Sequence, residues 1–216
     1  MTLAFIPARM TSRRFPGKVL APFRGEPLIR HAIRLGRDAV GADHVVVLTS
    51  SDPTDDPLAA YVAGLGTRVF RGPLDDVFAR FRACAVELRP DWILRINADS
   101  PLMSGRIVRA VLERTDGPYD LVTTIAPRTL PRGQNPEAIR ASALLAVDRA
   151  DLTDADREHV TPYFHRHTGR YRVRNVATTR GDLAQINLSV DTVEDLRRLE
   201  SLPEAETEAL IPESLD

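Results

Sequence analysis

Short runs of apolar residues alternate along the first part of the chain with longer stretches in which apolar residues recur every three or four positions. The runs lack polar alternation, which is typical of strands buried on both faces of a sheet. They cover residues 3–7, 44–49, 67–71, 91–97 and 119–125. The stretches between them predict helices at about 27–35, 56–65, 74–88 and 104–114. Because strands and helices alternate strictly, the pattern predicts an α/β fold with a mostly parallel sheet between two layers of helices.

The alternation breaks down between residues 127 and 169. Polar residues are dense there, and the segment contains four prolines: Pro127, Pro131, Pro136 and Pro162. We therefore expect an inserted arm at residues 128–170 that covers the edge of the sheet, with one helix at 141–149.

Regular patterning returns after this arm. Apolar runs predict strands at 171–176 and 186–190, and a helix is expected at 192–202, where Thr192 is placed to cap its first turn. The acidic residues from 203 to 216 show no such pattern, so they predict a loosely packed tail. No linker divides residues 1–202, which we expect to form a single domain.

Composition narrows the class of protein. The chain has 216 residues and a formal net charge of −1, so a basic site would be a local cluster, and a nucleic-acid partner is not expected. A single cysteine, Cys84, excludes an internal disulfide framework and is compatible with a reducing cytoplasm. No apolar run is long enough to span a membrane, and the first residues lack a basic leader. We expect a cytoplasmic protein.

One lysine stands out in a chain whose other 28 basic residues are arginines. Lys18 lies in a loop after the first strand together with Arg9, Arg13 and Arg14. Chance in an arginine-rich chain would explain a single lysine, but four cations in one short loop suit a ligand with several negative charges, such as a triphosphate. The loop is not a Walker phosphate loop, because Val19 follows the lysine where that motif has Ser or Thr.

Two aspartates follow predicted strands at the same edge of the sheet. Asp99 comes after the run at 91–97, and Asp191 ends the run at 186–190. Either aspartate could simply cap the next helix. Because loops after parallel strands meet at one edge, these carboxylates could instead join the cationic loop as Mg²⁺ ligands, since Mg²⁺ takes one or two carboxylates plus phosphate oxygens.

Glu158 and His159 leave two interpretations open. They precede Val160, Thr161 and Pro162, which is typical of the start of a helix, with a histidine that serves only local packing. The alternative is a role in binding an acceptor substrate.

Four motifs in the chain resemble those of the cytidylyltransferases that activate acidic sugars. They are Pro7-Ala8-Arg9-Met10-x-Ser12-x-Arg14-x-Pro16-Gly17-Lys18, Asp99-x-Pro101-Leu102, Arg157-Glu158-His159-Val160-Thr161-Pro162 and Val190-Asp191-Thr192-x-Glu194-Asp195-Leu196. The chain is similar to CMP-KDO and CMP-sialic acid synthetases, and most closely to the SpsF-like spore-coat polysaccharide branch, over residues 3 to 200. This resemblance implies a three-layer, Rossmann-like α/β/α sandwich that forms a homodimer through an arm like residues 128–170.

The resemblance also implies a role for each matching residue. Lys18 and Arg14 would be catalytic and, with Arg9, would bind the phosphates of CTP. Asp99 and Asp191 would bind Mg²⁺. The remaining nucleotide-binding positions would be Ala8, Ser12 and Arg13 in the loop, with Thr49 and Ser50 at the start of a cytosine pocket.

An acceptor-binding segment is implied at residues 130–137, which are similar to a family pattern Pro-Asp-Gly-x-Asp-x-Glu. Here Arg132 and Asn135 stand where acids are common, which should favour an anionic acceptor. Gln134 and Glu137 belong to the same segment, and Glu158 and His159 would complete the acceptor site.

These observations together predict an enzyme that transfers CMP from CTP to a small anionic acceptor, either a sugar acid or a molecule bearing a phosphate or phosphonate, and releases pyrophosphate. Three alternatives remain. They are a nucleotidyltransferase that uses another base, a glycosyltransferase of similar fold, and a nucleotide-binding protein without activity.

Overall fold

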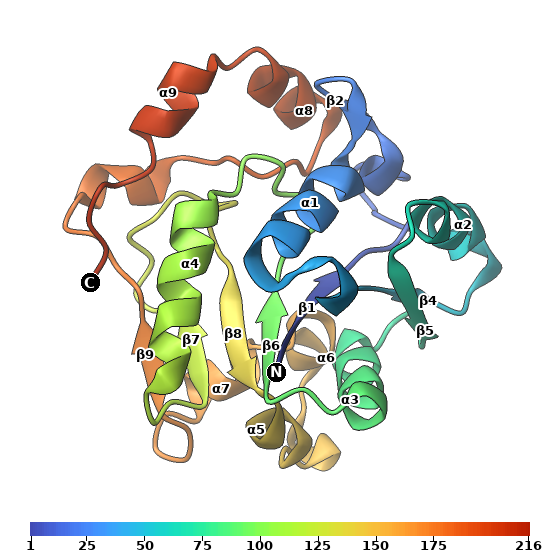
Figure 1. Cartoon of the computed structure of the whole chain (residues 1–216), viewed down its shortest axis with the longest axis vertical. Coiled ribbons are helices and arrows are strands. Elements are labelled where there is room, and N and C mark those ends of the chain that lie inside the picture. Colours follow the sequence, from blue (N-terminus) through green and yellow to red (C-terminus); the bar gives the residue numbers. More distant parts are fainter.

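The computed structural model describes all residues, 1–216, as one α/β/α sandwich around a seven-stranded sheet (Figure 1). The strands lie in the order β5-β4-β1-β6-β8-β7-β9. Their bounds are β1 (Thr2–Pro7), β4 (Val45–Ser50), β5 (Arg68–Gly72), β6 (Trp92–Arg95), β7 (Leu121–Thr123), β8 (Glu137–Arg140) and β9 (Val173–Asn175), with β2 (Pro22–Phe23) and β3 (Glu26–Pro27) forming a separate hairpin. Within the seven-stranded sheet, all neighbouring strands are parallel except at β8, which runs antiparallel to both β6 and β7. The predicted mostly parallel sheet is therefore confirmed.

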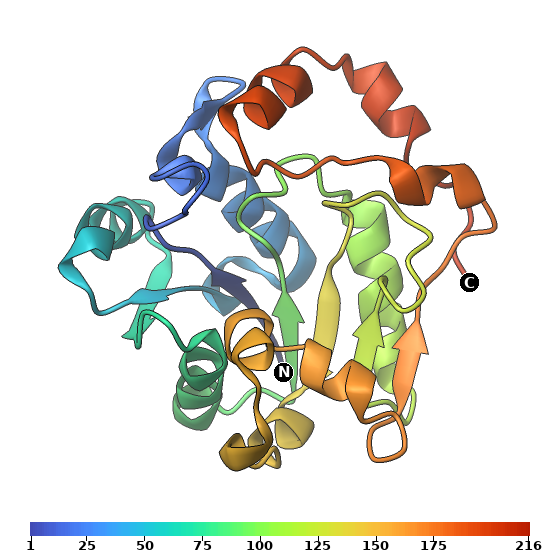
Figure 2. The ribbon, with the colours of Figure 1, turned by 180° about the vertical axis from the view of Figure 1, so that it is seen from behind.

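Helices cover both faces of this sheet (Figures 1 and 2). They are α1 (Leu28–Val40), α2 (Asp56–Gly64), α3 (Val77–Leu88), α4 (Gly105–Glu113), α5 (Ala141–Leu145), α6 (Asp154–His159), α7 (Pro162–Arg166), α8 (Val193–Glu200) and α9 (Glu204–Ala209). None of them combines the length and hydrophobicity needed to span a bilayer.

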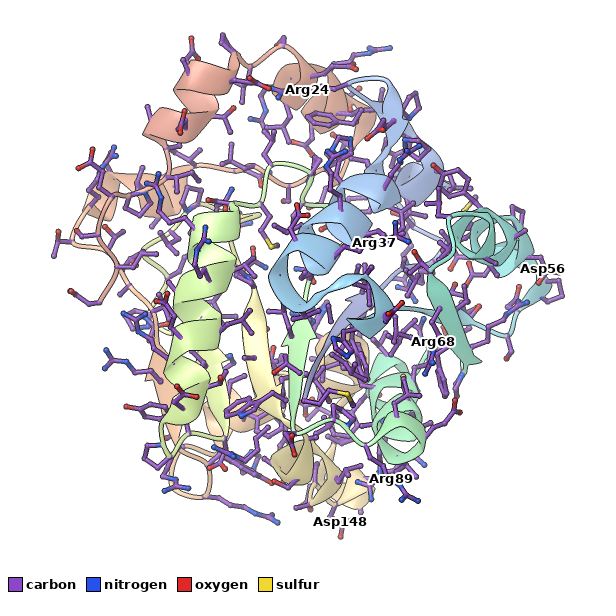
Figure 3. All side chains as sticks on the ribbon, viewed as in Figure 1. Arg24, Arg37, Asp56, Arg68, Arg89 and Asp148 are labelled. Carbon is purple, nitrogen blue, oxygen red and sulfur yellow. The ribbon has the colours of Figure 1, made fainter.

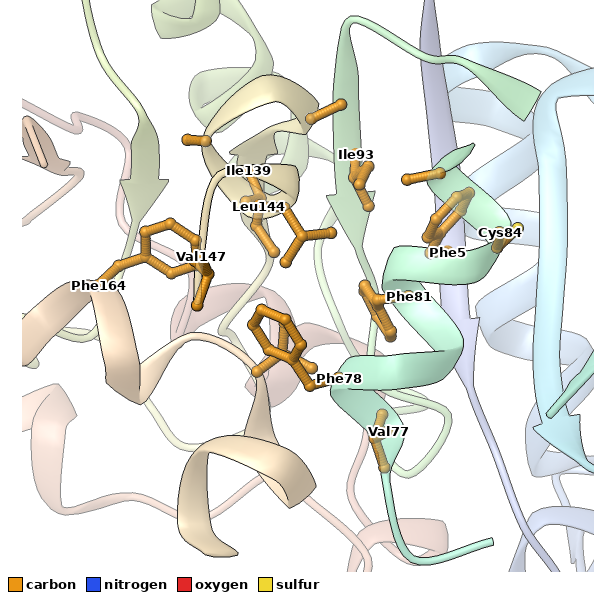
Figure 4. Close-up of a cluster of buried hydrophobic side chains, with 14 of the residues drawn as sticks. Phe5, Val77, Phe78, Phe81, Cys84, Ile93, Ile139, Leu144, Val147 and Phe164 are labelled. Atoms are coloured by element: carbon orange, nitrogen blue, oxygen red, sulfur yellow. The ribbon is translucent and has the colours of Figure 1, made fainter. Parts of the chain in front are cut away.

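Strand β1 contributes to a hydrophobic core on each face, which explains its continuous apolar sequence. Leu3 and Phe5 pack with α3, α5 and α7 in a cluster of 21 buried residues (Figure 4). Ala4 and Ile6 point the other way and pack with α1, α2 and α4. On that second face, Arg37 of α1 donates hydrogen bonds to the turn before β5 (Figure 3), so the helix layer is tied to the sheet by polar contacts as well.

Contrary to expectation, the segment 128–170 contributes to the interior of the molecule instead of covering an edge of the sheet. It supplies β8, an internal strand between β6 and β7, and then α5 and α7, whose apolar residues belong to the larger core. The edges of the sheet are β5 and β9. The sequence obscured β8 because only Ala138 and Ile139 form its apolar run, and its antiparallel partner in β6 lies about 45 residues earlier.

The prediction of a strand at 186–190 is wrong. This segment is extended but makes only one isolated bridge, between Arg132 and Asn187, and its other backbone hydrogen bonds also go to loops. Val190 donates to the Asp99 carbonyl at 2.8 Å, so the segment holds Asp191 beside the end of β6. The predicted cap at Thr192 is confirmed, because Thr192 and Asp195 form a capping box at the start of α8.

The tail after residue 203 is packed, contrary to expectation. Residues 204–209 form α9, and Ile211 is buried against Ile107 and Leu130. Asp216 exchanges two backbone hydrogen bonds with Ala177. The sequence did not predict this packing, because one isoleucine in an acidic segment is too weak a hydrophobic pattern.

Candidate functional site

A cavity of about 530 Å³ opens where β1 and β6 end. The loop after β1, the first turns of α3, the end of α6 and Asp191 complete its wall. Most of the residues predicted for the site line this cavity: Ala8, Arg9, Ser12, Arg13, Arg14, Lys18, Asp99, Glu158, His159 and Asp191. The cavity therefore lies at the edge of the sheet where the order of strands and loops predicted a binding site.

The loop from Ala8 to Lys18 has a defined shape. Gly17 adopts φ +73°, a left-handed conformation that glycine takes without strain, and its N–H donates to the Met10 carbonyl at 2.7 Å. A buried carboxylate, Asp55, anchors the loop to β4 because it accepts hydrogen bonds from Met10 N and Ser50 N. Burial alone would raise the pKa of Asp55, but these hydrogen bonds hold it below its ordinary value. Asp55 thus fixes the loop in place.

Lys18 lies at the centre of the site and makes three contacts. Its Nζ donates to Asp99 Oδ2 at 2.9 Å, to the Val190 carbonyl at 2.7 Å and to Asp191 Oδ1 at 3.3 Å. The side chain is only 12% exposed. An ammonium carries three N–H groups that point in three directions, whereas a guanidinium is flat, so this arrangement explains a lysine in an arginine-rich chain.

Asp99 and Asp191 both pair with the ammonium of Lys18. The exposed side chain of Arg14 also pairs with Asp191, at 2.9 Å. Two carboxylates that converge in this way fit a divalent cation completed by substrate phosphate oxygens. The molecule contains no cluster of three His, Cys, Asp or Glu side chains that would hold a metal alone. A cation held by these two carboxylates would therefore need further ligands from a bound molecule.

The end of α6 forms the opposite wall of the cavity. Arg9 and Glu158 make an ion pair of 2.9 Å between the loop and the helix, and His159 lies beside them. Glu158 and His159 form the end of α6, and the helix start expected after them is present, because α7 begins at Pro162. The place of both residues in the cavity is also compatible with the second interpretation, a role in acceptor binding.

Three polar lining residues were missed: Arg80, Arg95 and Asn97. Arg95 and Asn97 precede Asp99 at intervals of two, so strand periodicity could have placed all three on one side of the chain. Arg80 lies among the apolar residues of α3, three positions after Val77, and a charge on a buried stripe is the signal that could have revealed it.

Arg95 forms an ion pair with Glu137, which is fully buried and does not itself line the cavity. Glu137 Oε2 accepts from Arg95 Nη1 at 2.9 Å and from Thr161 Oγ1 at 2.8 Å, and Oε1 accepts from Thr123 Oγ1 at 2.7 Å. Burial would raise the pKa of Glu137, but His165, Arg95 and Thr123 together hold it below its ordinary value. Glu137 is thus a buried carboxylate behind the pocket wall.

The other predicted site residues do not line the cavity. Thr49 is buried at the end of β4, and Ser50 beside it bonds Asp55. Gln134 is buried and bridges Ser104 N and the Leu102 carbonyl, which fixes the turn after Asp99. Arg132 is exposed on the loop before β8.

Comparison with known proteins identifies the family of the chain. The profile of the cytidylyltransferase family matches residues 3–213. Spore coat polysaccharide biosynthesis protein SpsF of Bacillus subtilis (strain 168) is 32% identical over 206 residues, which cover 93% of this chain and 85% of SpsF. A 3-deoxy-manno-octulosonate cytidylyltransferase of Anaeromyxobacter sp. (strain Fw109-5) is 31% identical over 166 residues, which cover 76% of this chain and 64% of that enzyme.

Solved structures show the same architecture. A cytidylyltransferase from Leptospira borgpetersenii serovar Hardjo-bovis (strain JB197) superposes with a TM-score of 0.86 at 26% identity, covering 97% of this chain and 93% of that one. CMP:2-keto-3-deoxy-manno-octonic acid synthetase complexed with CTP has the same fold, with a TM-score of 0.73 at 19% identity over 95% of this chain and 99% of that one.

The fold and the site define a nucleotidyltransferase with a Rossmann-like α/β/α sandwich. Within that class, the chain belongs to the cytidylyltransferase family. The resemblance drawn from its motifs is confirmed, and the protein is an enzyme.

Proposed function

We propose that the protein transfers CMP from CTP to a small anionic acceptor and releases pyrophosphate. The observation that carries the proposal is Lys18, whose ammonium is held by Asp99, Asp191 and the Val190 carbonyl at the wall of a cation-rich cavity. This is the arrangement that a nucleoside triphosphate requires, because it brings fixed positive charge and metal-binding carboxylates to one place.

The reaction is an in-line displacement at the α-phosphorus. A bond forms from an acceptor oxygen to phosphorus, and the bond from phosphorus to the bridging oxygen of the leaving pyrophosphate breaks. An acceptor that attacks through a hydroxyl releases its proton to water. Lys18 and Arg14 neutralise the negative charge that grows on the α-phosphate and on pyrophosphate. Arg9 and Arg13 hold the outer phosphates, so positioning and charge stabilisation supply most of the rate.

Asp99 and Asp191 would hold Mg²⁺ together with phosphate oxygens. When bound, this cation offsets phosphate charge and orients the triphosphate. Lys18 and Arg14 keep the two carboxylates in place before the nucleotide arrives.

An anionic acceptor is supported by the charge of the cavity. Six cationic side chains line the cavity: Arg9, Arg13, Arg14, Lys18, Arg80 and Arg95. Only three carboxylates line it: Asp99, Glu158 and Asp191. A triphosphate with its metal does not need all of these cations. We assign Arg95 to the acceptor, with Glu137 positioning it from behind and with Glu158 and His159 at the opposite wall. An acceptor phosphate or phosphonate would already be ionised, so it would need no general base.

The similarity to SpsF supports a role in polysaccharide biosynthesis, and the similarity to a 3-deoxy-manno-octulosonate cytidylyltransferase favours a sugar acid as the acceptor. A cytoplasmic location agrees with the single cysteine and with the supply of CTP. We further propose a homodimer, in which residues 128–170 would contribute to the contact and the exposed Arg132 would lie near the acceptor.

Pyrophosphate release tests this proposal. The purified protein is incubated with Mg²⁺ and CTP, UTP, GTP or ATP, each with sugar acids, phosphorylated polyols and phosphonates. We expect CTP-dependent release with one acceptor class and a CTP-dependent rise in melting temperature. Release with another nucleotide alone, or transfer from a sugar nucleotide without pyrophosphate, would contradict the proposal.

A further inference from the structure

The turn between α6 and α7 holds Val160 in an unusual backbone conformation, with φ +69° and ψ −58°. The Thr161 N–H donates to the His159 carbonyl at 2.8 Å, so residues 159–161 form a γ turn with a positive φ at its centre. Such a turn is strained, and it is a genuine outlier for a residue whose side chain branches at Cβ. Strain of this kind persists only where the surrounding contacts impose it.

The side chain of Val160 anchors this turn. It is fully buried and belongs to the larger core cluster, together with Tyr163 and Phe164 of α7. The Val160 N–H also donates to the Asp156 carbonyl at 2.8 Å, which ties the turn to α6. Glycine takes a positive φ without strain, as Gly17 does in the loop after β1, but glycine has no side chain to bury. A valine at this position therefore accepts backbone strain in return for a turn that is fixed to the core.

The turn connects two walls of the cavity. On one side, Glu158 and His159 line the cavity at the end of α6. On the other side, Thr161 Oγ1 donates to Glu137 at 2.8 Å, and Glu137 pairs at 2.9 Å with Arg95, which lines the same cavity. Because a single residue separates His159 from Thr161, the backbone angles of that residue set the place of the α6 wall relative to Arg95.

We propose that Val160 is a positioning residue for acceptor binding. It does not line the cavity itself, so it acts only through its neighbours. Its strained turn holds Glu158 and His159 at a fixed distance from Arg95, so that both walls meet the acceptor together. A relaxed turn would let the end of α6 move and would weaken acceptor binding, whereas the CTP phosphates would still meet the loop after β1. The inference rests on the proposed acceptor role of these walls and adds the residue that sets their spacing.

Amide hydrogen exchange tests the turn without any substrate. Exchange is followed by NMR for the wild type, Val160→Ala and the control Val147→Ala. Val147 belongs to the same core cluster and loses the same two methyl groups, but its backbone conformation is ordinary and it does not line the cavity. Relative to the amides of β1, we expect the Thr161 amide to exchange at least about 10-fold faster in Val160→Ala than in Val147→Ala. Equal exchange in the two variants would show that the side chain of Val160 does not hold the turn, and would overturn the inference.

Steady-state kinetics test whether the turn serves the acceptor. Pyrophosphate release is measured with CTP and the acceptor class that the wild type uses. We expect Val160→Ala to raise the KM for the acceptor about 10-fold or more and to change the KM for CTP by less than about 2-fold. Val147→Ala should keep both KM values. Val160→Thr keeps the branched shape but buries a hydroxyl, so it should be less stable than the wild type and yet keep the acceptor KM.

The kinetic outcomes separate positioning from general packing. An acceptor KM that rises equally in Val160→Ala and Val147→Ala would overturn the inference, and so would an equal rise in Val160→Thr, because loss of stability would then explain the effect. Equal losses for CTP and acceptor in Val160→Ala would also overturn it. A wild type that releases no pyrophosphate from CTP with any acceptor class would instead refute the proposed function, which the hydrogen exchange of Thr161 does not depend on.

Discussion

The ammonium of Lys18 lies 2.9 Å from Oδ2 of Asp99, and these two residues come from loops that follow different strands. The contact joins the loop after β1 to the end of β6 across the floor of the cavity. With Asp191 and the Val190 carbonyl as further acceptors, all three N–H groups of Lys18 are occupied. In the proposed reaction, a phosphate group that entered the site would meet a cation whose position is already set.

Lys18→Arg tests whether this geometry matters beyond the charge. A flat guanidinium cannot donate in the three directions of the ammonium and is larger in a position that is only 12% exposed. We expect the rate of pyrophosphate release to fall about 10-fold or more, with the melting temperature nearly unchanged. The exchange Arg34→Lys, at an exposed position on α1, serves as the control for a change of cation alone. Turnover near that of the wild type would refute the special role of Lys18.

Asp191→Asn should change the response to Mg²⁺. The variant loses one of two converging carboxylates, so the cation would depend on Asp99 and the nucleotide phosphates. We expect the Mg²⁺ concentration that gives half-maximal activity to rise at least about 10-fold. Titration of activity with Mg²⁺ at saturating CTP measures this, and the exposed Asp75 provides the control Asp75→Asn. An unchanged Mg²⁺ requirement would show that Asp191 serves only to hold Lys18 and Arg14.

The sheet and the cationic loop could be predicted because their signals are local. A buried strand such as 3–7 shows in a few consecutive residues, and the charges of the loop lie between residues 9 and 18, directly after it. The prediction also put Asp99 and Asp191 at the same edge, but the segment before Asp191 is not a strand, and the hydrogen bond from Val190 to the Asp99 carbonyl holds it there instead.

The residues that were missed or misplaced depend on contacts between distant parts of the chain. Glu137 matched an acceptor motif, but its partners Arg95, Thr123 and Thr161 come from three other elements, and only their packing shows that it is buried. Arg80 could not be told from the other arginines by sequence, because its burial depends on the packing of α3 against β4, where it donates to the Leu48 carbonyl.

Glu137→Gln tests the buried ion pair behind the pocket. The substitution keeps the shape of the side chain but leaves the charge of Arg95 uncompensated. We expect the free energy of unfolding to fall by roughly 3 kcal/mol. The double variant Glu137→Gln, Arg95→Met should lose less than the two single variants together, because removing both partners leaves no unpaired charge. Chemical denaturation of the four proteins measures the coupling, and additive losses would contradict it.

A second buried carboxylate, Asp156, predicts how stability depends on pH. It caps α6 with Thr153 and pairs with Arg166 at 2.6 Å and 2.5 Å. Burial would raise the pKa of Asp156, but hydrogen bonds from Arg166 and Thr153 lower it from 3.8 to about 2. Because the folded protein has the lower pKa, the carboxylate stabilises the fold above pH 4, and this contribution is lost as the pH falls towards 2.

Asp156→Asn removes this contribution at neutral pH. We expect the variant to be about 2 kcal/mol less stable than the wild type at pH 7, and the difference to shrink to roughly half of that at pH 3. Urea unfolding of both proteins between pH 7 and pH 3 measures the two curves. The control is Asp154→Asn, because Asp154 lies exposed in the same first turn of α6 and should change stability by less than about 0.5 kcal/mol. If the gap between wild type and Asp156→Asn stayed constant over this range, the ion pair with Arg166 would not be the source of the stability.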